Sequence, residues 1–400
     1  MGASENSTKN IIILKYFKYD IFQPLTVFIF VTIFTFSMYL LNLIQYNKVN
    51  NEIYFVVLLS LFFFTSGDFI GRVSTKKTKF KKSNYIKEIS INTFIIISWL
   101  LGILSFYILC VKAINTYGLY VMFSDPDEFF RRGLLIVPFV GNFALLNIFV
   151  LPAVIYSIRY GKIKKRNILF AITSLIMASV LGKKSYFIIS LLMSAFIYMI
   201  HAKNIKKIII MSIIVVLITV LFFQIFEYMT ISNIEDYKWW HGFYIYLTGP
   251  WAALGELLRN PFETRDWGFY CFYPIYKVVG YIYNESVNTN VMPAVYIPVW
   301  YNVYTMHGEA FVDFGYIGII IQSLFLGFIA RKMYKIIKYN KNYMDALIYA
   351  LILTAVGLSF FNSIITHFSF IFLIAYILIW KLITMFITQL LQELKFCNIL

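Results

Sequence analysis

The residues best suited to chemistry form a basic hinge, Leu181-Gly-Lys-Lys-Ser-Tyr186, between two short apolar segments. Adjacent lysines attract an anion, and a helix that begins near Ser185 would add backbone N–H donors and a favourable dipole. The charge distribution described below places this hinge on the outer side of a membrane, where lysine is otherwise sparse. The pattern favours Lys183 and Lys184 as an anion-binding pair. Snorkelling of both side chains to lipid head groups is the alternative.

A second polar segment, Ser124–Arg132, contains Asp125 and Asp127 in the D-x-D spacing with which some glycosyltransferases bind a divalent metal. The same residues form a good helix start, because Asp125 suits the N-cap and Pro126 the first helical position. We therefore favour the helix start over a metal site. Arg131 and Arg132 follow about a turn later, where phosphate binding and snorkelling are both open.

Aromatic residues are concentrated in residues 227–313, a long segment between two apolar runs. Its middle, Thr248–Pro261, predicts a short helix with Pro250 in the first turn and Pro261 after the end. Aromatic rings next to membrane-spanning segments anchor proteins at the membrane interface. Aromatic rings also stack on the apolar faces of sugars. Arg259 and Arg265 lie among them. The tryptophans of this segment are Trp239, Trp240, Trp251, Trp267 and Trp300.

Motifs for other chemistries are missing from the sequence. The chain has no zinc pattern, no Walker loop and no dinucleotide fingerprint. Its 3 cysteines form no framework, and its 4 histidines are scattered too widely to predict a metal site. We therefore expect no metal, no cofactor and no nucleic acid partner. The formal net charge of +16 is better explained by membrane topology.

The elements that must position these residues are transmembrane helices. Apolar residues make up 60% of the chain and charged residues 14%, against about 45–50% and roughly 25% in soluble proteins. Runs of roughly 17–25 apolar residues can cross a bilayer, and each crossing must be helical. The sequence predicts an all-α polytopic membrane protein of about ten helices. They span 22–44, 53–70, 89–112, 133–158, 167–182, 185–201, 208–226, 314–330, 344–362 and 367–386.

The orientation follows from the loop charges. Cytoplasmic loops collect Lys and Arg, and most of these residues fall on the side of the N-terminus. We expect both termini, Lys79, Lys164 and Lys338 in the cytoplasm, with residues 227–313 outside. The chain then divides into a bundle of seven helices (1–226), the outer aromatic segment (227–313) and three C-terminal helices (314–400). Within a crossing, Asp68 is expected to pair with Arg72.

Three stretches of the chain resemble the oligosaccharide repeat-unit polymerases of the Wzy type. They are Leu181-Gly-Lys-Lys-Ser-Tyr-Phe187, where relatives usually have arginine at the position of Lys184; Tyr246-Leu-Thr-Gly-Pro-Trp-Ala-Ala-Leu254; and the segment Asn302–Gly318, which contains Asp-Phe-Gly-Tyr-Ile-Gly. The related O-antigen ligases have a histidine where this chain has Tyr304; the nearest one here is His307. This departure favours a polymerase.

The resemblance implies a GT-C-like membrane glycosyltransferase in the bacterial inner membrane. It would join polyprenyl-diphosphate-linked oligosaccharides into O-antigen or capsule, with inversion at the anomeric carbon. Fixed cations would stabilise the departing diphosphate, and a general base would assist the attacking hydroxyl. The implied cations are Lys183, Lys184, Arg259, Arg265, Arg131 and Arg132; the implied bases are Glu309, Asp313 and His307; the implied glycan platforms are Trp239, Trp240, Trp251 and Trp267.

The resemblance also names partners: membrane lipid, a chain-length regulator and a flippase. Two other activities stay open at this stage, an O-antigen ligase and a lipid-linked oligosaccharide flippase, as does a non-catalytic component of an export machine. A flippase would be expected to show repeated halves or polar residues in mid-membrane. The sequence has no internal repeat.

Overall fold

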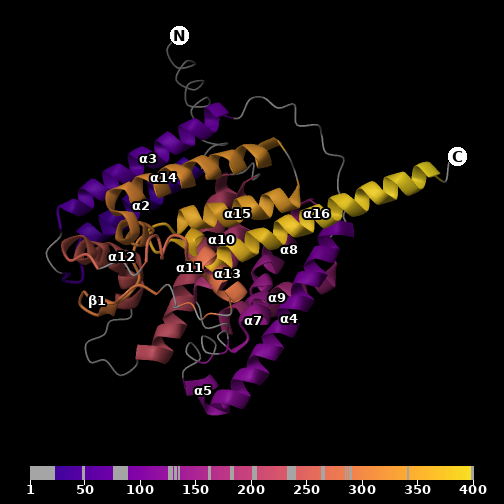
Figure 1. Cartoon of the computed structure of the whole chain (residues 1–400), viewed down its shortest axis with the longest axis horizontal. Helices are drawn as coiled ribbons and strands as arrows, with labels where there is room; N and C mark the ends of the chain where they lie inside the picture. The colour runs from indigo at the N-terminus through magenta and orange to yellow at the C-terminus, as the bar shows by residue number, and fades with distance from the viewer. Residues whose placement is uncertain are drawn as a thin grey trace, which may run out of the picture. The chain divides into compact units, whose positions relative to one another are not determined.

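The computed structural model is almost entirely helical (Figure 1). It describes residues 23–46, 50–74, 89–124, 136–160, 164–180, 184–200, 205–231, 240–262, 266–283, 291–339 and 342–397, together with residues 129, 133, 285 and 287. The only strands in these ranges are β1 (Val295–Tyr296) and β2 (Trp300–Tyr301), which pair antiparallel. The hinge at residues 181–183 and the Asp125–Asp127 segment lie outside them.

Each of the ten predicted apolar ranges contains helix. The helices are α2 (Pro24–Leu40), α3 (Glu52–Ser74), α4 (Ile89–Tyr117), the series α7 (Pro138–Phe143), η1 (Ala144–Phe149) and α8 (Val150–Tyr160), α9 (Lys165–Val180), α10 (Lys184–Met199), α11 (Ile205–Ile231), α14 (His307–Tyr339), α15 (Tyr343–Gly357) and α16 (Phe368–Cys397). Within the described ranges, 5 are long and apolar enough to cross a membrane. They are α3, α4, the run Val140–Tyr160, α14 and α16, and four shorter apolar helices accompany them.

Three further helices lie between these: α5 (Leu119–Ser124), α12 (His241–Arg259) and α13 (Tyr273–Tyr283). The chain folds into two compact units, and each draws on distant parts of the sequence. Unit 1 consists of residues 1–78, 199–335 and 352–368, and unit 2 of residues 79–198, 336–351 and 369–400. The division into residues 1–226, 227–313 and 314–400 stays a prediction.

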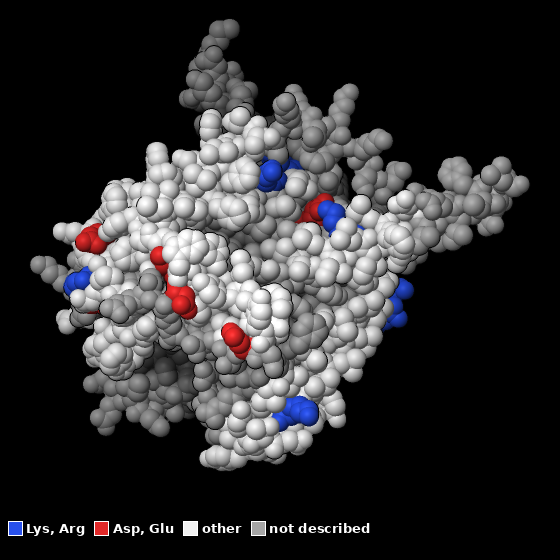
Figure 2. All heavy atoms as spheres, viewed as in Figure 1, with Lys and Arg blue, Asp and Glu red and all other residues white. Residues whose placement is uncertain are grey.

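Among the described residues on the face seen in Figure 2, uncharged side chains dominate and charges are few. Large apolar residues on the long helices are exposed, such as Leu58 and Phe62 on α3 and Ile317 on α14, each 65–66% exposed. A soluble protein rarely leaves wide apolar areas open to water. These helix faces are therefore suited to contact with lipid.

In unit 1, α3 and α14 pack closely because glycines remove the side chains between them (Figure 1). A Cβ atom at Gly67 would come within 2.1 Å of the Leu324 carbonyl oxygen, and one at Gly327 within 2.3 Å of the Phe64 carbonyl oxygen. Small residues commonly permit such close approach between membrane helices. Beside this contact Arg72 Nε donates to Asp68 Oδ2 at 2.7 Å, which confirms the predicted local pair.

Helix α12 belongs to the core of unit 1, where it packs against α2. Trp251 is 2% exposed, and its Nε1 donates to Thr35 Oγ1 at 3.1 Å. The Tyr244 hydroxyl donates to the Met38 carbonyl at 2.6 Å. Pro250 lies inside this helix, so the prediction that it occupies the first turn was wrong. Burial of Tyr244 and Thr248 extends the helix towards its N-terminus, although proline removes one backbone hydrogen bond.

Helix α14 is broken near its start by Gly315, whose φ of 60° and ψ of −147° are not helical. This conformation is available essentially only to glycine. Three residues later Gly318 passes so close to the first segment that a Cβ atom there would lie 2.1 Å from the Ala310 carbonyl oxygen. The Asp-Phe-Gly-Tyr-Ile-Gly stretch thus sets residues 307–314 at an angle to the remainder of α14.

Unit 2 is organised around α4. Trp99 Nε1 donates to Thr173 Oγ1 of α9 at 2.8 Å, and the hydroxyls of Ser98 and Tyr376 (α16) lie 3.0 Å apart. Lys381 Nζ donates to Asp345 Oδ1 at 2.7 Å, which joins α16 to α15. These contacts join helices that are remote in sequence. The polar cluster around Glu309 belongs entirely to unit 1.

Candidate active site

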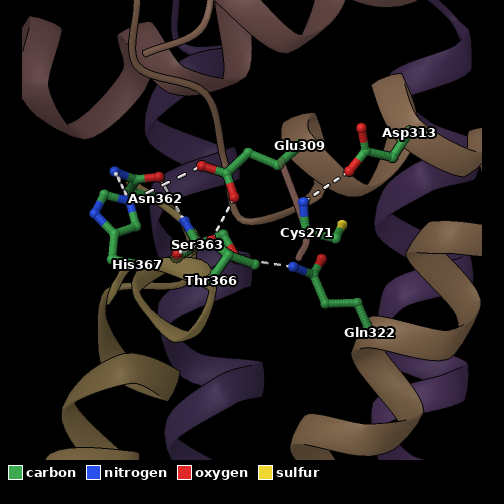
Figure 3. Close-up of polar contacts among 8 residues, drawn as sticks. All are labelled: Cys271, Glu309, Asp313, Gln322, Asn362, Ser363, Thr366 and His367. Carbon is green, nitrogen blue, oxygen red and sulfur yellow. Dashed lines mark hydrogen bonds and ion pairs between the residues drawn. The ribbon is translucent and has the colours of Figure 1, made fainter. Parts of the chain in front are cut away.

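A buried polar cluster of unit 1 surrounds Glu309, a residue of the first segment of α14 (Figure 3). Glu309 is 5% exposed as a whole residue, and its Oε2 forms a hydrogen bond with the hydroxyl of Thr366. Thr366 belongs to η2 (Ile364–Thr366), in the break between α15 and α16. A buried carboxyl group requires such partners. The break between α15 and α16 thus supplies the hydrogen-bond partner that the buried Glu309 requires.

The Thr366 hydroxyl has a second contact, with the Ser363 carbonyl oxygen at 2.6 Å. A hydroxyl carries one proton and can donate only once at full strength. If Glu309 is ionised, Thr366 donates to it and leaves the carbonyl to other donors. If Glu309 is protonated, its own O–H donates to Thr366, and Thr366 donates to Ser363. The two arrangements differ by one proton at Glu309 and need no movement of heavy atoms.

His367 lies on the other side of the same carboxyl group, with Nε2 3.9 Å from Glu309 Oε1. The Ser363 N–H donates to Asn362 Oδ1 at 2.7 Å, so the amide nitrogen of Asn362 faces His367 Nε2, at 3.2 Å. An amide nitrogen only donates. A neutral His367 ring with its proton on Nδ1 can accept this contact at Nε2. The side chain of His367 is 31% exposed and that of Glu309 6%, so only the histidine reaches outward.

The second part of α14 also contacts this break. Gln322 Nε2 donates to Ser363 Oγ at 2.8 Å, and both side chains are buried. The Met306 N–H donates to the Ser359 carbonyl at 2.8 Å. Residues before and after the Gly315 kink therefore hold the same turn, and the relative position of Glu309 and His367 is fixed from both sides.

Asp313 has a structural role in this arrangement. Its two carboxylate oxygens accept the N–H groups of Tyr270 at 3.3 Å and Cys271 at 2.7 Å, as the Cys271 bond in Figure 3 illustrates. It thereby ties the turn before α13 to α14. Burial raises the pKa of the Cys271 thiol, and the negative charge of Asp313 raises it further. Cys271 and Cys110 are both free thiols.

His307 is 3% exposed, and its Nδ1 has no hydrogen-bond partner among the described residues. This atom does not contact Glu309, because residues two apart in a helix point in different directions. Glu309 turns to Thr366 and His367 instead. His307 therefore lies beside the cluster without joining its hydrogen-bond chain.

The predicted cations are mostly outside the described ranges. This holds for Lys183, Arg131, Arg132 and Arg265, and for the side chain of Lys184. Arg259 is described, and its Nη1 forms an ion pair with Glu256 Oε1 at 2.7 Å. Its positive charge is thus partly balanced within α12.

The predicted aromatic platforms differ in exposure. Trp267 is 75% exposed and contacts the ring of Phe314 edge-on, at 5.2 Å between centroids. Trp240 is half-buried beside Tyr244, and Trp251 is in the core, where its ring meets Phe36 rather than solvent. Trp239 lies outside the described residues. Within the described part of the chain, no group of three or more acidic, histidine or cysteine residues is arranged to hold a metal.

The helices and the buried polar cluster define an all-α membrane protein that crosses the bilayer several times. Residues 302–389 match the family model of the O-antigen polysaccharide polymerase Wzy, which confirms the predicted relationship to the Wzy-type polymerases. No curated protein and no solved structure matches the chain significantly. The matched range contains both sides of the Glu309 cluster.

Part of this cluster escaped the sequence analysis. Asn362, Ser363, Thr366 and His367 lie at the junction of two predicted crossings, where polar residues look like an ordinary short loop. The available signal was their density, since the junction is otherwise flanked by long apolar runs. Only the fold brings them to Glu309.

Proposed function

We propose that this protein polymerises oligosaccharide repeat units linked to polyprenyl diphosphate, as an inverting membrane glycosyltransferase. One observation carries the proposal: the segment that matches the polymerase family, residues 302–389, contributes Glu309, Gln322, Asn362, Ser363, Thr366 and His367, the polar groups gathered in Figure 3. The proposal includes about ten crossings, a GT-C-like architecture, an inner-membrane location with cytoplasmic termini, and a flippase and a chain-length regulator as partners.

In the proposed reaction, a hydroxyl oxygen of one repeat unit forms a bond to the anomeric carbon of the growing chain. The bond from that carbon to the diphosphate oxygen breaks, and its electron pair leaves with polyprenyl diphosphate. The hydroxyl proton passes to the enzyme. Attack from the face opposite the leaving group inverts the anomeric configuration.

The pair of Glu309 and His367 is our candidate for accepting that proton. The partly exposed ring of His367 is the member that an acceptor sugar can reach. A neutral ring takes up the proton at Nε2, where it displaces the N–H of Asn362. Ionised Glu309, 3.9 Å away, stabilises the imidazolium that results. A positioned base of this kind contributes roughly 100-fold to 10,000-fold to a rate. Asp313 and His307 are left with supporting roles. Trp267, which is exposed and contacts Phe314 of α14, is the candidate for stacking on a sugar.

The experiment that tests the function is reconstitution of the purified protein with a synthetic lipid-diphosphate-linked repeat unit. A ladder of products differing by one repeat is expected from the wild type. Glu309→Gln and His367→Ala should reduce the ladder at least roughly 100-fold. Glu256→Gln, which removes a carboxylate from α12, is the matched control and should leave the ladder unchanged.

Absence of any ladder from folded wild-type protein, in the presence of a repeat unit that the host is known to polymerise, would refute the proposed function. A normal ladder from Glu309→Gln would refute the base assignment alone.

A further inference from the structure

Helix α13 carries a cation close to the Glu309 cluster. Lys277 Nζ lies 4.8 Å from the ring centroid of Phe368 and 5.9 Å from that of Tyr281. Phe368 directly follows His367 in the chain and begins α16. Lys277 therefore reaches the same turn that supplies the partner of Glu309, from a helix that the sequence analysis did not identify.

One side of α13 is apolar and open, and Lys277 lies at the border of this side, next to Tyr281. Ile275 is 61% exposed, Ile282 and Tyr283 are each 72% exposed, and Val278 and Val279 are 46% and 44% exposed. Tyr273 and Gly280 are buried, so the helix has one side against the protein and one side away from it. Lys277 is half-buried and contacts protein rings. The short helix thus combines an apolar surface with one positive charge at its edge.

This combination is complementary to a lipid with a phosphate head and a long apolar tail. A cation held over aromatic rings keeps its charge while its stem stays in apolar surroundings. The head-group phosphate requires a fixed positive charge, and the tail requires continuous apolar area. A neutral sugar would use neither feature, and a free phosphate would leave the apolar side unused.

We propose that α13 binds the lipid diphosphate of the substrate, with the phosphate groups at Lys277 and the polyprenyl tail along Ile275, Val278, Val279 and Ile282. The inference rests on the proposed function for the identity of the lipid. The diphosphate leaving group would then contact Lys277, whose Nζ lies over the ring of Phe368, the residue after His367. Charge of this kind, aimed at an oxygen that becomes negative as the bond breaks, lowers the barrier to departure.

Binding is measured without turnover, by native mass spectrometry of the full-length protein in detergent with three lipids. These are a polyprenyl diphosphate, the corresponding neutral polyprenol and phosphatidylglycerol. The variants are Lys277→Gln, Lys277→Arg, Ile282→Asp and a matched control, Lys332→Gln. Lys332 also lies over an aromatic ring, that of Phe328 at 5.1 Å, but near the far end of α14 from Glu309. Thermal unfolding of each variant verifies its fold.

We expect Lys277→Gln to weaken binding of the polyprenyl diphosphate by roughly 10-fold to 100-fold, the usual effect of losing a charge-assisted contact. Binding of the polyprenol and of phosphatidylglycerol should stay the same. Lys277→Arg should restore binding, Ile282→Asp should weaken both polyprenyl lipids, and Lys332→Gln should change nothing.

Undiminished diphosphate binding by folded Lys277→Gln would overturn the inference. So would an equal loss for phosphatidylglycerol, because the lysine would then anchor any anionic lipid. These outcomes are separate from those of the polymerisation assay. Selective binding without a product ladder would retain the lipid site and remove the proposed function.

Discussion

The substitution Thr366→Val tests the hydrogen bond that holds Glu309. Valine keeps the branched shape of threonine and removes only the hydroxyl group, which bonds to Glu309 and to the Ser363 carbonyl. The carbonyl retains a partner, because the Thr366 N–H also donates to it at 3.2 Å. The main loss is therefore at Glu309. Its buried carboxyl group loses its hydrogen bond to the Thr366 hydroxyl, and no second hydroxyl among the described residues is bonded to it.

Leaving one buried polar group without a partner costs about 1–3 kcal/mol. We expect Thr366→Val to lower the free energy of unfolding by this amount, and Thr366→Ser, which keeps the hydroxyl, to lower it by less than about 1 kcal/mol. Thermal unfolding in detergent measures the difference. Since the bond also fixes the orientation of the carboxyl group, product formation should fall in Thr366→Val and largely persist in Thr366→Ser.

A double-mutant cycle with Glu309→Gln isolates the contact itself. Residues that share a hydrogen bond show coupling energies of about 0.5–3 kcal/mol. Strict additivity of the two substitutions would show that the Thr366 hydroxyl and the Glu309 carboxyl do not interact in the folded protein. The proton arrangement derived from their geometry would then be wrong.

Three further predictions concern the surroundings of the cluster. Burial and the charge of Asp313 raise the pKa of the Cys271 thiol, so little thiolate is present at neutral pH and maleimide should label Cys271 slowly in the native protein. Asp313→Asn should speed this labelling. Equal rates in both proteins would contradict the effect of the Asp313 charge. Gly67→Ala places a Cβ atom 2.1 Å from a backbone oxygen of α14, so α3 and α14 must separate and the thermal midpoint should fall; an unchanged midpoint would show that the two helices do not pack this closely. In a chain without its native cysteines, an impermeant reagent should label Glu285→Cys from outside the cell and Lys338→Cys only after lysis, and the reverse pattern would invert the topology.

The sequence by itself determined the helical class and the positions of the helices. Apolar runs long enough to span a bilayer must be helical, because lipid offers no partners for backbone N–H and C=O groups. This local requirement is why helix lies in each of the ten predicted ranges. The pairing of Asp68 with Arg72 was predictable for the same reason, since four residues along a helix are neighbours on its surface. The third stretch of resemblance, Asn302–Gly318, lies at the start of the matched residues 302–389.

The tertiary structure decided which distant residues meet. Glu309 could be picked out from its place before an apolar run, but its partners Thr366 and His367 come from a turn more than fifty residues later, and no spacing rule links them. The sequence pattern also placed Trp251 on a surface, whereas packing against α2 buries it. The kink at Gly315 directs Glu309 to that turn, because glycine alone accepts its backbone angles. Helical periodicity describes one segment at a time, and the contacts that assemble this site join separate segments.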